Sequence, residues 1–227
     1  MINRTWTTID GRDAFNISVA GDGKESVEAE AKLALARAVS EVEKAGFAKA
    51  HIVRSRLFAL DSATRQAASD VRRATLVGDL RGGSSSFVDA ERMPRGSRVI
   101  MELTAVGPLA AEAKKTVREY EPVIAPPMFV TLDGLVFLSG NTDESATFET
   151  QLDAIRHKID ASLAVAGTHI SKAVVISAFM SKKVNVVDGR KAIAARFAAA
   201  GCPINLTTVE GYSAATKRIE IEVTARA

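Results

Sequence analysis

The sequence predicts an α+β protein made of two tandem β-β-α-β-α-β-β units, with helices packed on one face of each sheet. Three observations support this prediction. Landmark sequences recur about 120 residues apart, apolar residues alternate in short runs, and two long segments carry apolar residues at helical spacing. The 227 residues are enough for two domains of ordinary size, and 47% apolar with 25% charged residues is typical of a globular protein.

The internal repeat is visible in landmarks that keep one order. TIDG at 8–11 recurs as TLDG at 131–134, and an alternating apolar run that ends in glycine follows each. The strand-like run at 51–60 recurs at 172–180. The halves end in the similar runs MELTA and IEVTA. Chance would rarely align so many landmarks in one order, so we interpret the two halves as copies of one unit.

The elements of each half follow from local patterns. The first two strands flank an Asp-Gly pair, which favours a hairpin. A long amphipathic helix follows and ends before Gly46 in the first half and Gly167 in the second, where glycine commonly terminates a helix. A strand, a second helical stretch and a final pair of strands complete each unit. The stripes of the two long helices comprise Val27, Ala31, Ala34, Leu35, Ala38, Val39 and Val42, and Phe148, Leu152, Ile155, Ile159 and Leu163.

The chain divides into a first domain at 1–107, a linker at 108–126 and a second domain at 127–227. Residues 109–119 of the linker could form a short helix. Pro122, Pro126 and Pro127 then enforce extended chain, because proline restricts both itself and the residue before it.

Composition excludes several classes of function. A formal net charge of +3 comes from interspersed charges, and the densest basic stretch, at 92–98, has acidic neighbours. Aromatic residues are few, so we expect no nucleic-acid partner. The sequence lacks an apolar stretch of about 18 residues, so we expect no membrane span. Cys202 is the single cysteine, which suits the cytoplasm, and with three scattered histidines we expect no metal and no cofactor.

Four segments together resemble one known family. They are LVFLSGN at 135–141, the helix at 148–167 with Phe148 and Gln151, the last strand at 218–225, and the Met-Pro-Arg-Gly turn at 93–96. Taken together in their order along the chain, these segments resemble the RidA (YjgF) family, also called endoribonuclease L-PSP-like. The resemblance covers nearly the whole chain except the linker. The resemblance implies a fold like that of bacterial chorismate mutase, and trimeric rings with pockets between neighbouring units.

The resemblance also implies that an anchoring arginine has been lost. In the family's deaminases, an arginine in a Pro-Ala-Arg-Ser motif holds the substrate carboxylate, which suits its planar fork of donors. Counting back from the last strands places Ser85 at that position in the first half and Asn205 in the second, where Pro203 matches the family's proline. Asparagine would bind a carboxylate poorly, although it can hydrogen-bond an amide, hydroxyl or carbonyl.

The family's other polar positions survive only in the second half. The glutamate that positions the attacking water corresponds to Glu220 in the second half and to Ile100 in the first. The Ser-Gly pair corresponds to Ser139 and Gly140 in the second half, whereas the first half has Ala20 in place of the serine. The first site is therefore degenerate at Ser85, Ile100 and Ala20. The candidate substrate-binding residues are Asn205, Ser139, Gly140 and Glu220.

Each candidate also has a purely structural interpretation. Glu220 alternates with apolar residues, and this pattern also describes a solvent-facing strand. Asn205 follows a proline at a loop-to-strand junction, where asparagine is a common turn residue. Gly140 ends a strand, where glycine more often serves backbone geometry than chemistry.

Four functional hypotheses follow. The first is a RidA-like protein that binds a small polar metabolite at an inter-domain cleft without deaminating imines. The second is an imine or enamine deaminase whose anchor is another arginine, Arg81 or Arg190. The third, an RNA-related translation inhibitor, is disfavoured by the charge pattern. In the fourth, the first half is structural. Because two units per chain cannot close one three-fold ring, we expect a homotrimer with a pseudo-hexameric domain arrangement.

Overall fold

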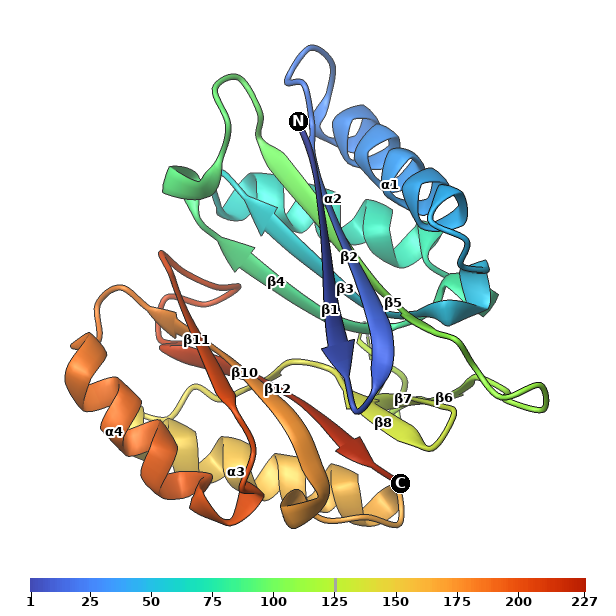
Figure 1. Ribbon diagram of the computed structural model, residues 1–227. Coiled ribbons are helices and arrows are strands. Elements are labelled where there is room, and N and C mark those ends of the chain that lie inside the picture. The colour runs from blue at the N-terminus through green and yellow to red at the C-terminus, as the bar shows by residue number, and fades with distance from the viewer. Residues whose placement is uncertain (125) are drawn as a thin grey trace.

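The computed structural model describes residues 1–124 and 126–227 and contains two β-sheets, each covered on one face by two α-helices (Figure 1). The helix-covered faces point outward, and the two sheets face each other between the helical layers. Each unit has its own apolar core between its helices and its sheet. Two further apolar clusters contain residues of both units, so the units also bury a shared interface. The predicted α+β fold with two tandem units is confirmed.

The first sheet has the strand order β1-β2-β5-β3-β4. β3 and β4 are parallel, whereas the other neighbours are antiparallel. The strands are β1 (Ile2–Ile9), β2 (Arg12–Ala20), β3 (Ile52–Ala59), β4 (Gly83–Val88) and β5 (Val99–Gly107).

The second sheet repeats this arrangement in the order β11-β10-β12-β8-β7, extended by β6 at one edge. β10 and β11 are its parallel pair, as β3 and β4 are in the first sheet, and the short β9 pairs with β12. The strands are β6 (Thr116–Arg118), β7 (Phe129–Leu132), β8 (Leu135–Leu138), β9 (Asn141–Thr142), β10 (Ala173–Ser181), β11 (Ile204–Val209) and β12 (Ile219–Arg226).

The repeated Asp-Gly pair forms the same turn in both units. Asp10 and Gly11 have φ values of 51° and 78°, and Asp133 and Gly134 have φ values of 49° and 73°. Two successive positive φ angles define the type I′ turn that matches the twist of a tight hairpin. Aspartate tolerates this region and glycine occupies it at no steric cost, so the repeated dipeptide fixes the register of both hairpins.

Both long helices form as predicted and begin at residues that cap them. The N-cap side chains of Ser26 and Thr147 accept hydrogen bonds from backbone N–H groups of the first turn. Gly46 and Gly167 follow the helix ends with positive φ. The α-helices are α1 (Val27–Lys44), α2 (Ser62–Thr75), α3 (Phe148–Val165) and α4 (Val186–Arg196). The 3-10 helices are η1 (Lys49–His51), η2 (Gly78–Leu80), η3 (Ala90–Arg92), η4 (Ile170–Lys172) and η5 (Ala198–Ala200).

The short helix expected at 109–119 does not form, and that prediction is wrong. Residues 116–118 instead form β6, which pairs with β7 from Thr116 opposite Thr131 to Arg118 opposite Phe129. Lys115 fixes the preceding chain because its ammonium donates to the carbonyls of Ile52 and Asp79. Pairing with an available sheet edge therefore overrides the local helical pattern of this segment.

Backbone hydrogen bonds and buried aromatic side chains are among the contacts that hold the units together. Gly140 donates its backbone N–H to the carbonyl of Ser84, and Val88 forms an isolated antiparallel bridge with Gly211. Nearby, aromatic rings of both units form a buried cluster with Ala20 and Ile100. Its members are Ala20, Phe58, Phe87, Ile100, Phe179, Val209 and Tyr212. Phe58 and Phe179, which correspond in the repeat, thus lie in one cluster across the interface.

No helix in the described part of the chain is both long and apolar enough to cross a membrane.

Candidate functional site

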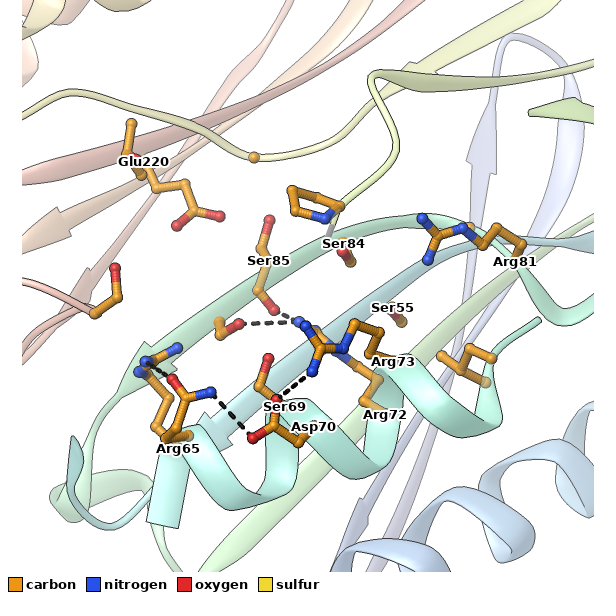
Figure 2. Close-up of a pocket in the computed structure, with 18 of the residues that line it drawn as sticks. Ser55, Arg65, Ser69, Asp70, Arg72, Arg73, Arg81, Ser84, Ser85 and Glu220 are labelled. Atoms are coloured by element: carbon orange, nitrogen blue, oxygen red, sulfur yellow. Dashed lines mark hydrogen bonds and ion pairs between the residues drawn. The ribbon is translucent and has the colours of Figure 1, made fainter. Parts of the chain in front are cut away.

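A polar pocket of about 310 Å³ lies where the two units meet (Figure 2). The first unit contributes one face of α2 and the start of β4, and the second contributes Gly140, Lys217 and Glu220 among others. Its size falls at the lower end of small-molecule sites. Because the lining residues of the two parts, up to Ser86 and from Pro126 onward, are separated by 40 residues of sequence, only the association of the units creates the pocket.

Helix α2 presents a stripe of side chains to this pocket. Arg65, Ser69, Arg72 and Leu76 follow one another at spacings of four, three and four residues, and all of them line it. This spacing places them on one side of a helix. The neighbouring stripe of Thr64, Ala68 and Val71 is buried. The helix begins at the N-cap of Asp61, whose carboxylate accepts from the Thr64 N–H at 2.8 Å.

Arg72 is a buried cation without an acidic partner. Its side chain is 7% exposed, and its guanidinium donates to the carbonyl of Ser85 and to Oγ of Ser86. Burial lowers the pKa of Arg72 to about 10, although the nearby Glu220 favours its charged form. None of the described acidic residues forms an ion pair with it.

Arg65 is nearly as buried, at 9% exposed. It donates to Oε1 of Gln66, which in turn donates to Asp70, while its own Nε is buried without a hydrogen-bond partner in the described structure. Burial lowers the pKa of Arg65 as well. A buried donor without a partner carries a desolvation cost that a bound acceptor would remove.

Glu220 faces these arginines from β12 of the second unit (Figure 2). It is 6% exposed, and burial raises its pKa to about 7, with the charge of Glu222 adding to the rise and Ser85 and Arg72 opposing it. A carboxyl group with this pKa is half protonated at neutral pH, so it can accept or donate a proton under working conditions. The structural alternative of a solvent-facing strand residue does not hold for Glu220.

Gly140 allows Glu220 to reach this position. A Cβ atom at residue 140 would overlap both Oε1 of Glu220 and Oγ of Ser85. Glycine at this position therefore leaves the space that the side chains of Glu220 and Ser85 occupy. The neighbouring Ser139 is buried and its hydroxyl accepts from the N–H of Ser84 at 3.1 Å, which fastens the loop to the first unit.

Glu222, two residues from Glu220, has the opposite electrostatic state. It pairs with Arg54 at 3.0 Å and Arg56 at 2.6 Å, and accepts from Oγ of Ser85 at 2.7 Å. Burial alone would raise the pKa of Glu222, but these two cations outweigh it and lower the pKa to about 2. Glu222 is thus a fixed charge that joins the units, whereas Glu220 is a titratable one.

The residues singled out from the sequence fall into separate places. Ser85, Gly140 and Glu220 line the pocket together. Asn205 is exposed on β11, opposite Ser177, and does not line it. Ile100 and Ala20, the degenerate positions, lie in the aromatic cluster.

The two arginines proposed as relocated anchors also differ in position. Arg81 lines the pocket, but its guanidinium already makes two hydrogen bonds of 2.9 Å to the carboxylate of Glu119. Arg190 is exposed on α4 and does not line the pocket.

Sequence reasoning missed Arg65 and Arg72, because the resemblance directed attention to the strand position held by Ser85. The signal that could have found them is two arginines seven residues apart on the partly buried side of an amphipathic helix. Charged side chains are rarely so buried unless they are paired.

Among the described residues, no three histidine, cysteine, aspartate or glutamate side chains are grouped to hold a metal ion. Cys202 is half-buried, and burial raises the pKa of its thiol, which disfavours the nucleophilic thiolate.

Comparison with known proteins gives similarity at the level of structure. No family model matches the sequence, and no curated protein matches it. A chorismatase is similar over 98% of this chain and 77% of its own, with 11% identity and a TM-score of 0.60.

Smaller proteins are similar to half of the chain. Rv2704 of Mycobacterium tuberculosis, a member of the YjgF/YER057c/UK114 family, is similar over its whole length to 50% of this chain, with 18% identity and a TM-score of 0.45. YyfA of Yersinia pestis, a member of the Rid family, is similar over 99% of its own length to 50% of this chain, with 23% identity and a TM-score of 0.43. The chain consists of two tandem α+β units, and over nearly its whole length its fold is similar to that of a chorismatase.

Proposed function

We propose that this protein binds a small polar metabolite with at least one acidic group in the pocket between its two units. The observation that carries this proposal is the placement of Arg65 and Arg72 opposite the buried Glu220, since both are buried guanidinium groups that form no ion pair with the described acidic residues. Serine and threonine hydroxyls that line the same pocket supply further donors and acceptors.

Energetics favour an anionic ligand at this place. A buried charge without a counter-charge is costly, and a carboxylate that pairs with a guanidinium forms short, charge-assisted hydrogen bonds. The arginines are already desolvated and oriented, Arg72 by Ser85 and Ser86 and Arg65 by Gln66. Little further ordering is therefore required on binding, and such preorganisation increases affinity.

The expectation that no imine is deaminated rested on the missing arginine at Ser85 and Asn205. The arginines of α2 supply a cation from another element, so hydrolysis of an imine or enamine acid is our second candidate function. Glu220 favours this candidate, since a carboxyl group with a pKa of about 7 can position and deprotonate a water molecule. The Arg81 and Arg190 version of this hypothesis has less support, because one is paired with Glu119 and the other lies outside the pocket.

A pair of variants on α2 tests the binding proposal. Ser69→Leu fills the pocket between the two arginines, whereas Ala74→Leu adds the same type of side chain at an exposed position of the same helix. Binding of acidic metabolites from a panel is measured by calorimetry. We expect the first variant to lose affinity by at least about tenfold and the second to bind as the natural protein does. Equal binding by all three proteins would contradict the proposal.

Ammonia release from an imine generated in situ tests the second candidate. If Glu220 positions the water, Glu220→Gln lowers kcat by about 100-fold or more while the ligand still binds. Turnover that Glu220→Gln leaves unchanged, or no turnover in a protein that binds the acid, would exclude this reaction at the pocket.

We also propose a homotrimer with a pseudo-hexameric domain arrangement, on the symmetry argument made from the duplicated sequence. Light scattering of the full chain checks it, and a stable monomer would contradict it.

A further inference from the structure

The geometry points to a ligand with two separated acidic groups, such as a small dicarboxylic acid, one group bound by Arg65 and the other by Arg72. This inference rests on the proposed function, since it specifies the charge and shape of the ligand in that pocket. Three observations support the inference: the other cations of the pocket already have acidic partners, Arg65 and Arg72 lie apart along α2, and the titratable Glu220 faces them.

The other cations that line the pocket already have acidic partners. Arg73 pairs with Asp70 at 2.9 Å, Arg81 with Glu119 at 2.9 Å, and Lys217 with Glu144 at 3.5 Å. In the described chain, Arg65 and Arg72 have no such partner within ion-pair distance. A ligand that neutralises both of them therefore carries two negative charges.

The two guanidinium groups are held at different places along α2. Seven residues of helix correspond to a rise of about 10 Å between their Cα atoms. Arg72 is fastened to β4 through Ser85 and Ser86, whereas Arg65 is oriented by Gln66 at the other end of the stripe (Figure 2). Figure 2 shows the two guanidinium groups at separate places, each beside its own partners, so one phosphate or carboxylate group would contact only one of them well. Two acidic groups joined by a short chain fit this arrangement.

The surface between the two arginines suits such a connecting chain. Ser69 lies between them on the same face of the helix, four residues after Arg65 and three before Arg72. Its small side chain leaves room for a few carbon atoms, and its hydroxyl can bond to a polar substituent. The ligand's chain would therefore cross Ser69, with Glu220 on the opposite wall.

Binding a dianion also affects the proton on Glu220. An ionised Glu220 repels the ligand, whereas a protonated one does not, so affinity increases as the pH falls through the range in which this carboxyl titrates. The same coupling requires that binding at neutral pH takes up protons. The charged and titratable groups that act on Glu220 or are acted on by it are Arg54, Arg56, Arg65, Arg72, Tyr212, Lys217 and Glu222.

The experiment uses calorimetry on the full chain with succinate, glutarate and adipate, their monoamides, and inorganic phosphate. The diacids vary the separation of the two charges, each monoamide removes one charge at nearly constant shape, and phosphate places its charge on one group. We expect the best diacid to bind at least tenfold more tightly than its monoamide and than phosphate. We also expect its affinity to rise at least threefold from pH 8 to pH 6, with proton uptake seen as a dependence of the measured heat on the buffer.

Variants make the assignment to Arg65 and Arg72 specific. Arg65→Gln should reduce the affinity for the diacid to that of the monoamide while changing monoamide binding less than threefold. Arg72→Gln should do the same, and Arg65→Gln alone carries the test if loss of the contacts to β4 impairs folding. Arg37→Gln, which removes an exposed charge from α1, should leave both affinities unchanged.

The outcomes separate this inference from the proposed function. Monoamides or phosphate that bind as tightly as the best diacid, with binding abolished by Ser69→Leu, would overturn the two-group inference and keep the pocket. Diacid binding that Arg65→Gln leaves unchanged would overturn it equally. If neither this series nor any acid of the metabolite panel binds, the proposed function itself is wrong.

Discussion

Equivalent positions of the two units serve different purposes. On the last strand of the first unit, Ile100 is packed against Phe58 and Phe87, whereas the corresponding Glu220 of the second unit lines a polar pocket. Ala20 of the first unit lies in the same apolar cluster, while Ser139 of the second accepts a hydrogen bond from the first. One copy therefore has apolar packing at these positions, whereas the other has polar side chains in or beside the pocket.

The comparison shows how a duplicated unit can divide the parts of one site. The first unit has no polar site of its own at Ile100 and Ala20, yet it supplies Arg65, Arg72 and Ser85 to the pocket that contains Glu220. The first unit thus contributes polar groups to the pocket in addition to apolar packing. Its helix α2 provides the cations, and the second unit provides the titratable carboxyl group.

The largest effect is expected when the first unit receives at Ile100 the glutamate that the second unit has at the corresponding position, Glu220. Ile100→Glu places a carboxyl group in an aromatic cluster where the cations over the rings, Arg92 and Arg56, already pair with Asp89 and Glu222. We therefore expect a loss of about 4 kcal/mol or more in the free energy of unfolding, or no folding. Ile100→Val, which keeps the site apolar, should cost about 1 kcal/mol. Urea denaturation measures both. A well-folded Ile100→Glu protein of natural stability would contradict the assignment of this region to packing.

The second-largest difference in stability is expected between Glu222 and Glu102, which lie two residues after Glu220 and Ile100 on the corresponding strands. Glu222→Gln leaves Arg54 and Arg56 without their buried partner and should cost about 3–5 kcal/mol. The corresponding Glu102 is partly exposed and pairs only at 3.7–3.9 Å, so Glu102→Gln should cost less than about 1 kcal/mol. Equal costs for both variants, measured by urea unfolding, would show that the two strand positions are not distinguished as described.

The pH dependence of stability should identify Glu220. Its pKa is raised from 4.5 to about 7 in the folded state, so the folded protein holds more protons than the unfolded chain between these values. The contribution of Glu220 to stability is therefore greatest below pH 4.5 and decreases as the pH rises to 7, by of order 1–3 kcal/mol. Glu220→Gln should remove this decrease, so its advantage over the natural protein should be larger at pH 8 than at pH 5.

Chemical denaturation at pH 5 and pH 8 measures that difference. A variant whose stability parallels that of the natural protein at both pH values would mean that Glu220 titrates as an ordinary surface carboxyl. In the first unit, Ile100→Val provides the control, because it changes stability without adding or removing a titrating group.

The smallest contrast concerns the two positions that correspond to the family's arginine. Ser85→Ala removes the hydroxyl that donates to Glu222, which should cost about 1–2 kcal/mol and weaken ligand binding. Asn205→Ala acts at an exposed position outside the pocket, so it should change neither stability nor affinity by more than about 0.5 kcal/mol. Loss of ligand binding in Asn205→Ala would place the site elsewhere.

Local sequence signals account for much of the fold. The Asp-Gly pairs at 10–11 and 133–134 predict both hairpins because their conformation is specified within the dipeptide, and Gly46 and Gly167 predict the helix ends for the same reason. The strand β6 could not be predicted in this way. Its conformation depends on pairing with β7, a contact made across the linker rather than within it.

The pocket residues also divide into those that the sequence can locate and those that only the packing of the two units reveals. Glu220, Gly140 and Ser85 could be located by their place in the repeat, and the structure brings these three together. The contribution of α2 to the pocket could not be predicted, because it depends on how the first unit packs against the second. A local sequence pattern does not indicate such a contact. Asn205 shows the converse case, since its place in the repeat is clear but the second unit leaves it exposed.

A crystal structure of the full chain with the tightest-binding acid from the panel tests the central claim most directly. We expect density for the ligand between the α2 face that carries Arg65 and Arg72 and the wall that carries Glu220, with an acidic group against each guanidinium. Density on the exposed surface of β11 beside Asn205, with the pocket between the units free of ligand, would contradict the account.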